Sequence, residues 1–226
     1  MIPGPGQAVV HLMEAAGRGT AADHAILSKE EHDRAERFHF ETDRQRWIGW
    51  RAGLRRILGR YLGMSPVDVP LVADESGKPR LAAPHGGWHF NLSHASSLAA
   101  LVIAREGPVG VDLEETIRAG SLAECTDEFC HPAEIEALPA AAAVRCLALL
   151  HLWTCKEALL KALGTGFAFP PRTLRITGCS ATADSPLPGL DGLHLVFPPP
   201  PPDHLLAVAL PLSIRHLEII NDTLFS

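Results

Sequence analysis

The sequence predicts an α+β fold made of two related halves. Strand-like and helix-like patterns alternate along the 226 residues, and a hydrophobic content of 46% is enough to bury a substantial core. The late segment HLLAVAL (204–210) echoes SLAALVIA (97–104), so the second half resembles the first. We therefore expect an N-terminal half over residues 1–107 and a C-terminal half over residues 108–226.

The first half begins with a strand and continues with two helices. AVVHLMEA (8–15) has the composition of a strand, and LSKEEHDRAERFHF (27–40) has an N-cap at Ser28 with Glu31 three residues on, as in a capping box. Residues 43–62 repeat apolar side chains at helical spacing up to Gly63. LAALVIA (98–104) then predicts a short buried strand.

The second half begins with PVGVDLEE (108–115), which predicts a strand after the Gly107–Pro108 turn. The remaining elements are two predicted helices (132–138 and 140–163), three strands (174–177, 193–197 and 204–210), a loop (180–189) and a stiff run of prolines (198–202). The last residues, NDTLFS, are expected to be loosely held.

Composition argues against several classes of partner. A net charge of −6 provides no basic field for nucleic acid, and no apolar run approaches the roughly 20 residues that span a bilayer. The N-terminus lacks the basic and apolar regions of a signal peptide. The five cysteines are odd in number and form no CxxC motif, which favours a reduced, cytoplasmic protein. From the charge and the apolar runs together, we expect neither nucleic-acid nor membrane partners.

Two carboxylates follow the period of the strand in PVGVDLEE. Alternation sends Val111 and Leu113 toward the core, and Gly110, Asp112 and Glu114 to the other face. Two carboxylates beside a glycine can reach one hard cation, and magnesium prefers such ligands together with substrate phosphates. A solvated strand edge carrying acids is the alternative, and a third carboxylate from elsewhere would favour the metal.

The stretch WTCKEALLKALGTGF (153–167) offers that third carboxylate. At helical spacing Trp153, Glu157 and Lys161 form a stripe that leads to Gly164, while Lys156 lies about 100° off it and is expected at the surface or behind the site. An ordinary Glu–Lys pair across one helical turn would explain the stripe equally well.

Cationic side chains suggest an anion site. His94 lies in HFNLSHASS (89–97), a segment that fits a structural turn or a site, and Lys78 lies in the turn-like SGKPRL (76–81). Six arginines and no acid lie between residues 44 and 60, among them Arg46 and Arg51 on either side of the apolar arc. A solvated basic face accounts for most of them, although the guanidinium group also suits phosphate.

These motifs resemble those of the 4′-phosphopantetheinyl transferases. GKP, FNLSHA, VGVDLEE and WTCKEALLKALGTGF occur in the order and approximate spacing of that family, over roughly two-thirds of the chain from about residue 27 to 169. The pairing of G-V-D-x-E with W-x-x-K-E-x-x-x-K is specific. The chain is most similar to the larger, surfactin-type branch, which implies a pseudo-dimeric fold with the active site between two similar halves.

The resemblance implies a reaction and its acidic residues. The enzyme would transfer 4′-phosphopantetheine from coenzyme A to a serine of an acyl or peptidyl carrier protein and release 3′,5′-ADP. Asp112, Glu114 and Glu157 would bind Mg²⁺, with Mn²⁺ as the alternative. Glu157 would also deprotonate the serine, and Lys161 would neutralise the leaving phosphate.

The resemblance also implies how coenzyme A is held. Lys78 and Pro79 of the GKP motif, His94, and either Arg46 or Arg51 would hold its 3′-phosphate and adenosine end. A monomer is expected, because one chain supplies both halves. Carriers of fatty-acid, polyketide and nonribosomal-peptide synthesis all fit.

Two other functions fit the same residues. A coenzyme A or nucleotide-binding regulator would keep the basic contacts without turnover. A magnesium-dependent phosphohydrolase would use the acids to activate water, and its product would be free phosphopantetheine.

Overall fold

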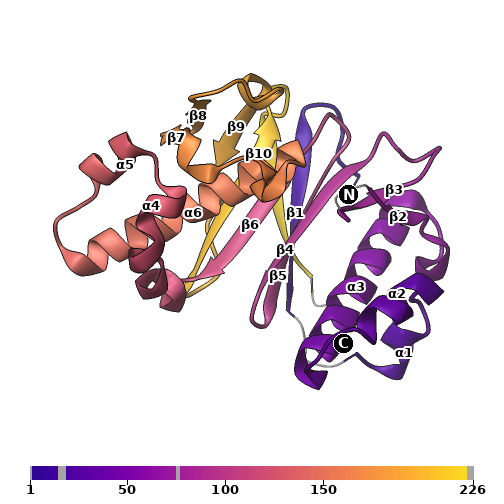
Figure 1. Ribbon diagram of the computed structural model, residues 1–226. Coiled ribbons are helices and arrows are strands. Elements are labelled where there is room, and N and C mark those ends of the chain that lie inside the picture. Colours follow the sequence, from indigo (N-terminus) through magenta and orange to yellow (C-terminus); the bar gives the residue numbers. More distant parts are fainter. Residues whose placement is uncertain (1, 15–18, 75–76, 223–226) are drawn as a thin grey trace.

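The first part of the chain alternates strands and helices in the computed structural model, which describes residues 2–14, 19–74 and 77–222 (Figure 1). Its elements are β1 (Gln7–Glu14), α1 (Ala21–His24), α2 (Lys29–Ala35), α3 (Glu41–Leu62), η1 (Pro66–Asp68), β2 (Leu71–Ala73), β3 (Pro79–Leu81), β4 (His89–Ala95) and β5 (Leu98–Ala104). A capping box at Ser28 and Glu31 starts α2, and Gly63 ends α3 in the left-handed conformation, both as predicted.

The second part repeats this alternation. Its elements are β6 (Gly110–Glu115), η2 (Thr116–Cys125), α4 (Thr126–Phe129), α5 (Pro132–Ala137), α6 (Ala142–Leu163), η3 (Gly166–Ala168), η4 (Pro171–Thr173), β7 (Leu174–Thr177), β8 (Ser180–Ala183), η5 (Leu190–Gly192), β9 (Leu193–Val196), β10 (His204–Pro211) and β11 (His216–Asp222). Among the described residues, no helix is both long enough and apolar enough to cross a membrane.

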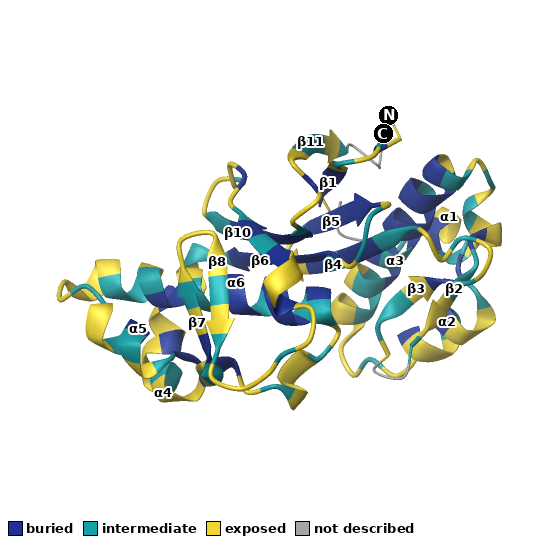
Figure 2. Cartoon of the chain, turned by 90° about the horizontal axis from the view of Figure 1, so that it is seen from above, coloured by how far each residue is buried: buried dark blue, intermediate teal, exposed yellow. Residues whose placement is uncertain are grey.

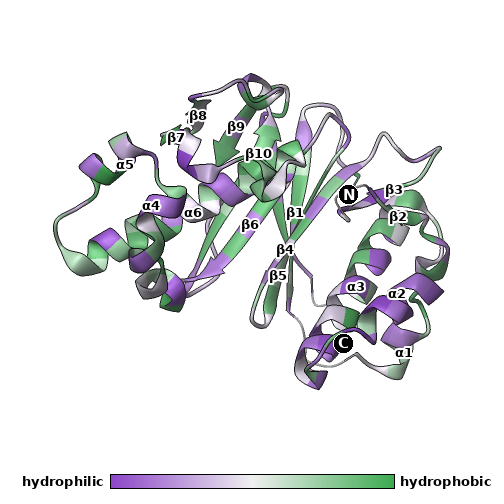
Figure 3. Cartoon of the chain, viewed as in Figure 1, coloured by the Kyte–Doolittle hydropathy of each residue, from purple (hydrophilic) through white to green (hydrophobic). Residues whose placement is uncertain are grey.

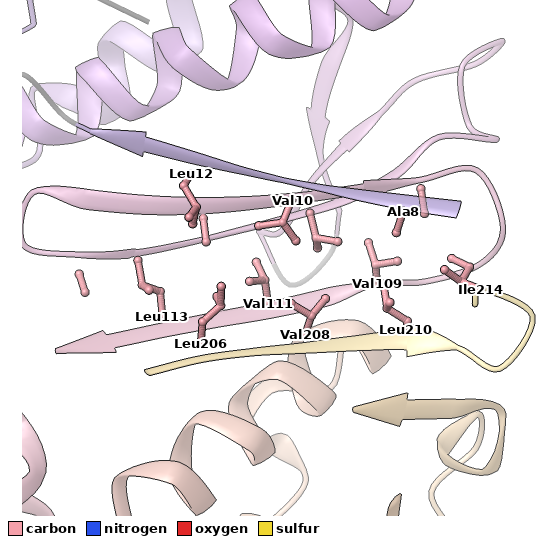
Figure 4. Packing of buried hydrophobic residues seen from close by; sticks show 14 residues of the cluster. Ala8, Val10, Leu12, Val109, Val111, Leu113, Leu206, Val208, Leu210 and Ile214 are labelled. Carbon is pink, nitrogen blue, oxygen red and sulfur yellow. The ribbon is translucent and has the colours of Figure 1, made fainter. Parts of the chain in front are cut away.

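Two sheets meet at the centre of the molecule. One has the strand order β11-β1-β5-β4 and the other β6-β10-β9, and Figure 4 shows their apolar side chains meeting between β1 and β5 on one side and β6 and β10 on the other. Alternate residues of each strand enter this core, such as Val102 of β5, Val111 of β6 and Val208 of β10. The α+β prediction is therefore confirmed, whereas the pseudo-dimeric relation between the halves stays a prediction.

A long helix covers the outer face of each sheet. On one side α3 packs Trp50 and Leu54 against Leu101 and Ile103 of β5, and on the other α6 packs Ala158 against Ala207 of β10 and its neighbours. Figure 2 shows the strands β5 and β6 almost wholly buried, while α2 and α4 carry exposed residues. Figure 3 shows the same division as hydrophobic strands and mixed, partly hydrophilic helices. The helices thus carry side chains to both outer faces of the stacked sheets.

Three predicted segments differ from the structure. HFNLSHA is a strand, β4, rather than a turn, and the predicted loop 180–189 begins with β8, which pairs with β7 as a hairpin. The tail was expected to be loose, but its residues 221–222 belong to β11, and residues 223–226 lie outside those described. Residue 15 of the first predicted strand also lies outside them.

The last strand, β11, joins the sheet of the first half by pairing in parallel with β1. Its end is fixed by side chains: the Asp222 carboxylate accepts a hydrogen bond from His11 Nδ1 and pairs with Arg60 at 2.7 Å. His11 Nε2 lies 2.6 Å from the hydroxyl of Tyr61 on α3. The chain therefore returns to its starting sheet, and the division at residues 107 and 108 stays a prediction.

Candidate active site

A close approach of α6 to β6 creates the site. A Cβ atom on Gly110 would lie only 2.0 Å from the Ala158 carbonyl oxygen and 2.6 Å from the Ala162 amide nitrogen. Helix and strand therefore touch backbone to backbone, which only glycine allows. This contact places the second face of β6, with its two acids, beside the stripe of α6.

Asp112 is the central carboxylate of the site. Its side chain is 4% exposed, and its Oδ1 accepts hydrogen bonds from Lys161 Nζ at 2.6 Å and Ser93 Oγ at 2.9 Å. Its Oδ2 is buried and has no hydrogen-bond partner among the described residues. A buried carboxylate oxygen without a partner is costly, so this atom is suited to an additional cation or donor.

The stripe of α6 faces this carboxylate. Lys161 Nζ lies 2.6 Å from Asp112 and 3.9 Å from Glu157 Oε2, so its nearer partner is on the strand and not on its own helix. Trp153 Nε1 donates to Glu114 Oε1 at 3.1 Å, and Arg118 pairs with Glu114 Oε2 at 2.6 Å. The structure thus brings the predicted acids and Lys161 to one region, and it adds Ser93 and Arg118 to them.

Negative charge is in excess in this region. Burial and the neighbouring Asp112 charge raise the pKa of Glu114, against the opposing effect of Arg118. Burial also raises the pKa of Glu157, opposed by Lys161 and reinforced by Asp112 and Glu114. The Asp112 charge therefore makes ionisation of both glutamates less favourable.

A divalent cation would relieve this excess, and the donor set fits one. Among the described residues, no three acidic, histidine or cysteine side chains are already gathered around a single centre. Asp112 faces Lys161, and Glu114 faces Trp153 and Arg118. The free oxygen of Asp112 and the raised pKa values of Glu114 and Glu157 nevertheless provide the oxygen ligands and the negative charge that Mg²⁺ prefers.

Lys78 and Pro79 approach the same region from the first half. The Lys78 ammonium donates to the backbone carbonyl of Lys161, and burial together with the Lys161 charge lowers its pKa, against the effect of Asp74. Both residues line a cavity of about 300 Å³ that also includes Gly164 at the end of α6. Lys78 therefore joins the segment before β3 to the backbone near the end of α6.

His94 is exposed and lies flat on Trp50 of α3, with ring centroids 3.9 Å apart and an angle of 13° between the planes. Although part of the residue is open to solvent, protein atoms around the ring desolvate it, and this desolvation and the Lys161 charge lower the pKa of His94, opposed by Asp112. The neutral ring is therefore favoured when no anion is bound. An approaching phosphate would reverse this preference.

The two candidate arginines differ in environment. Arg46 is exposed and lies 3.7 Å from Asp43 of its own helix. Arg51 forms a mostly buried ion pair with Glu31 of α2 and lines a cavity of about 910 Å³. The structure therefore brings Arg51 to a hollow that an anion could enter, and leaves Arg46 on the surface.

Sequence reasoning did not single out the other side chains of this cavity. Arg34, Arg37, Phe38 and Trp47 line it together with Arg51, and the Arg34 guanidinium lies 5.7 Å from the centre of the Trp47 ring. Basic and aromatic residues interleaved in the segment RAERF (34–38) were the available signal. This combination suits a ligand that carries both phosphate and a flat ring.

The expectation that Lys156 could lie at the surface was wrong. This lysine is 1% exposed and lies 2.6 Å from Glu134 of α5, and its ammonium also donates to the carbonyls of Phe129, Pro171 and Leu174. It is a buried structural cation that ties four segments to α6, because the helix is covered on this side as well.

Comparisons with known proteins identify the family of the chain. Residues 108–190 match a family model described as the 4′-phosphopantetheinyl transferase superfamily, and residues 19–106 match one described as 4′-phosphopantetheinyl transferase, N-terminal. Together the two matches cover most of the chain. The chain belongs to the 4′-phosphopantetheinyl transferase superfamily.

Named members of this superfamily are similar in sequence. The chain is 38% identical over 147 residues to the 4′-phosphopantetheinyl transferase HetI of Nostoc sp., covering 64% of this chain and 62% of that protein. It is 33% identical over 158 residues to a phosphopantetheinyl transferase of Thraustochytrium sp., covering 64% and 55%. A third relative, the L-aminoadipate-semialdehyde dehydrogenase-phosphopantetheinyl transferase of Schizosaccharomyces pombe, is 28% identical over 166 residues, covering 67% and 64%. The chain thus spans less than two thirds of the length of these phosphopantetheinyl transferases.

Proposed function

We propose that the chain transfers the 4′-phosphopantetheine group of coenzyme A to a serine of an acyl or peptidyl carrier protein. The serine oxygen forms a bond to the β-phosphorus, and the bond from that phosphorus to the bridging oxygen breaks. 3′,5′-ADP leaves with the bridging oxygen, and the serine proton passes to a base on the enzyme. The superfamily name and the names of the relatives describe 4′-phosphopantetheinyl transfer, which supports the proposal.

One observation carries this proposal: Lys161 and Glu157 of α6 lie beside Asp112 of β6 because Gly110 allows the two backbones to touch. A base, an ammonium and an acidic ligand set are thereby held on two rigid elements. Such transfers depend on positioning and on electrostatic stabilisation, and they need no covalent enzyme intermediate.

Glu157 is the proposed general base. Its raised pKa makes it a stronger acceptor of the serine proton than an exposed glutamate, which general base catalysis near neutral pH favours. Lys161 is the proposed partner of the leaving phosphate, where negative charge develops as the bond to the bridging oxygen breaks. Its 27% exposed side chain can reach a ligand while Asp112 holds it.

Asp112, Glu114 and Glu157 are the proposed ligands of a magnesium ion, with manganese as the alternative. A bound divalent cation supplies Lewis-acid neutralisation of the pyrophosphate. The unpartnered oxygen of Asp112 supports this assignment. Ser93 and Trp153 would hold Asp112 and Glu114 in place through the hydrogen bonds described above.

The 3′-phosphate and adenosine end of coenzyme A is proposed to lie against Lys78, Pro79 and His94. Of the two arginines, Arg51 is supported by its position in the larger cavity, and Arg46 would have to leave Asp43 to reach the ligand. This end of the substrate would therefore bind to the first half, while the pyrophosphate binds to the second.

The proposal includes the arrangement and setting of the enzyme. We propose two similar halves that divide at residues 107 and 108, with the active site between them; the two family matches, which meet between residues 106 and 108, support this division. We also propose a surfactin-type, monomeric, cytoplasmic enzyme whose partners are coenzyme A and carrier proteins, and neither nucleic acid nor membrane. Carriers of fatty-acid, polyketide and nonribosomal-peptide synthesis are the candidates.

Intact-mass spectrometry of apo carrier proteins tests the function. After incubation with coenzyme A and magnesium, each accepted carrier should gain one phosphopantetheine, and EDTA or the variant Glu157→Gln should abolish the gain. The exposed Glu136 of α5 provides a matched control, because Glu136→Gln should leave the rate unchanged. Consumption of coenzyme A without modified carrier would replace the proposal with a phosphohydrolase. Neither consumption nor modification with carriers of all three classes would leave a binding protein.

A further inference from the structure

The aromatic stack beneath His94 involves a residue to which no role has yet been assigned. Trp50 is 7% exposed and belongs to the buried face of α3, whereas His94 is exposed at the end of β4. With ring centroids 3.9 Å apart and planes 13° from parallel, the indole covers one face of the imidazole. The histidine ring therefore rests on a fixed, flat support and keeps the rest of its surface available to a ligand.

Fold stability alone does not explain a tryptophan at this position. Its Nε1 is buried and has no hydrogen-bond partner among the described residues. A buried N–H group that loses water without gaining an acceptor weakens the fold. The side chains of the apolar neighbours of Trp50 on this face, Leu54, Ile57 and Leu58, offer no acceptor to this group, which phenylalanine would lack. Polar groups left unsatisfied in this way are expected where function constrains the residue.

A wide aromatic ring has two consequences for a histidine that meets an anion. It restricts rotation of the imidazole, so that the imidazole stays parallel to the indole and its two nitrogens keep fixed directions. It also attracts an imidazolium through the negative face of the indole, which is the strongest of the aromatic rings in this respect. Both effects act when His94 becomes charged beside a phosphate, and neither requires Trp50 to touch that phosphate.

We propose that Trp50 is a positioning residue that acts through His94 to select donors carrying a 3′-phosphate. This inference rests on the proposed function, in which His94 contacts the 3′-phosphate of coenzyme A. It adds that discrimination between coenzyme A and dephospho-coenzyme A, which differ only in that phosphate, depends on the stack.

Steady-state kinetics with the two donors tests the proposal. In Trp50→Leu the KM for coenzyme A should rise about fivefold to tenfold, the range of one lost cation–π contact. The KM for dephospho-coenzyme A and kcat with either donor should change less than twofold. Trp50→Phe should lie between wild type and Trp50→Leu in KM, while its thermal stability equals or exceeds that of wild type. A Trp50→Leu effect of equal size on both donors would overturn the proposal.

Two further variants separate positioning from general damage to the helix. Leu54→Ala removes a fully buried neighbour on the same face of α3 and should lower thermal stability without changing the ratio of the two KM values. His94→Gln should reduce the discrimination without abolishing it, because Lys78 and an arginine would still contact the 3′-phosphate, and adding Trp50→Leu to it should cause no further loss. If the double variant lost discrimination beyond His94→Gln, Trp50 would act independently of His94, contrary to the proposal.

Calorimetric binding of 3′,5′-ADP and of 5′-AMP tests the stack without turnover. The wild-type protein should prefer 3′,5′-ADP, and Trp50→Leu should weaken that ligand about fivefold to tenfold while leaving 5′-AMP unchanged. This pattern would uphold the role of Trp50 even if no carrier were ever modified. Conversely, an active transferase in which Trp50→Leu binds both nucleotides as wild type does would refute the role and leave the proposed function intact.

Discussion

Replacing Gly110 by alanine should disrupt the backbone contact between β6 and α6 on which the site depends. The added Cβ would lie 2.0 Å from the Ala158 carbonyl oxygen, and reaching the 3.4 Å of ordinary van der Waals contact requires a shift of about 1.4 Å. Both groups belong to backbone inside regular elements, so neither can turn aside as a side chain would. Overpacking of this kind costs about 3 kcal/mol of unfolding free energy. A displacement near 1 Å of the groups on α6 should lower kcat/KM roughly 100-fold.

The assay combines carrier modification rates with urea denaturation. Gly49→Ala is the matched control: this glycine lies within α3, and an added Cβ would meet no atom within 4 Å. It should retain the wild-type rate, and its free energy of unfolding should rise by up to about 1 kcal/mol, because alanine is a better helix former than glycine. Wild-type rate and stability in Gly110→Ala would refute the close contact between β6 and α6, and with it the explanation of how the site forms.

Three further predictions concern buried charges. In Asp112→Asn the pKa of Glu157 should fall, because the Asp112 charge helps to raise it; NMR titration of the carboxyl groups in metal-free protein measures this, and an unchanged or higher value would contradict the coupling. Lys156→Met should lower the unfolding free energy by about 3–5 kcal/mol because Glu134 stays buried without its cation, and Lys156→Met with Glu134→Leu should recover part of that loss in urea. Asp222→Ala should lower the unfolding free energy by about 2 kcal/mol and speed hydrogen exchange of the β11 amides, since it removes the acceptor that anchors this strand. Unchanged exchange would show that the backbone pairing alone holds the strand.

The buried strands were the most predictable part of the fold. The segment predicted at 98–104 is β5 to the residue, because its continuous apolar run is buried on both faces between the core and α3. β11 was missed because its side chains are mostly half-buried and its sequence, HLEIIND, contains charged and polar residues. Its stability comes from pairing with β1 at the other end of the chain, a non-local contact that no local pattern reports.

The sequence predicted the face of the strand or helix on which each site residue lies better than it predicted the contacts between these residues. Strand alternation correctly placed Asp112 beyond the core, and helical spacing correctly placed Glu157 and Lys161 on one side of α6. The same spacing left open a surface position for Lys156, because it did not show that this side of α6 is covered as well. That helix is apolar around most of its circumference, which is typical of a helix covered on several sides. The apolar residues around the whole helix thus indicated that it is covered on several sides, which the spacing of one stripe alone does not show.

The contacts of Lys161 favour a functional site over a pair that only stabilises the helix. A Glu–Lys pair selected for helix stability would keep the ammonium close to Glu157 and would add a few tenths of a kcal/mol. Instead the ammonium lies 2.6 Å from Asp112 and 3.1 Å from Ser93, both on other elements, and 3.9 Å from Glu157. Burial, reinforced by Asp112 and Glu114, keeps the pKa of Glu157 raised despite Lys161, and one oxygen of Asp112 has no hydrogen-bond partner among the described residues. An arrangement that lowers stability at two neighbouring carboxylates is not explained by packing, and it is expected where a ligand supplies the missing positive charge.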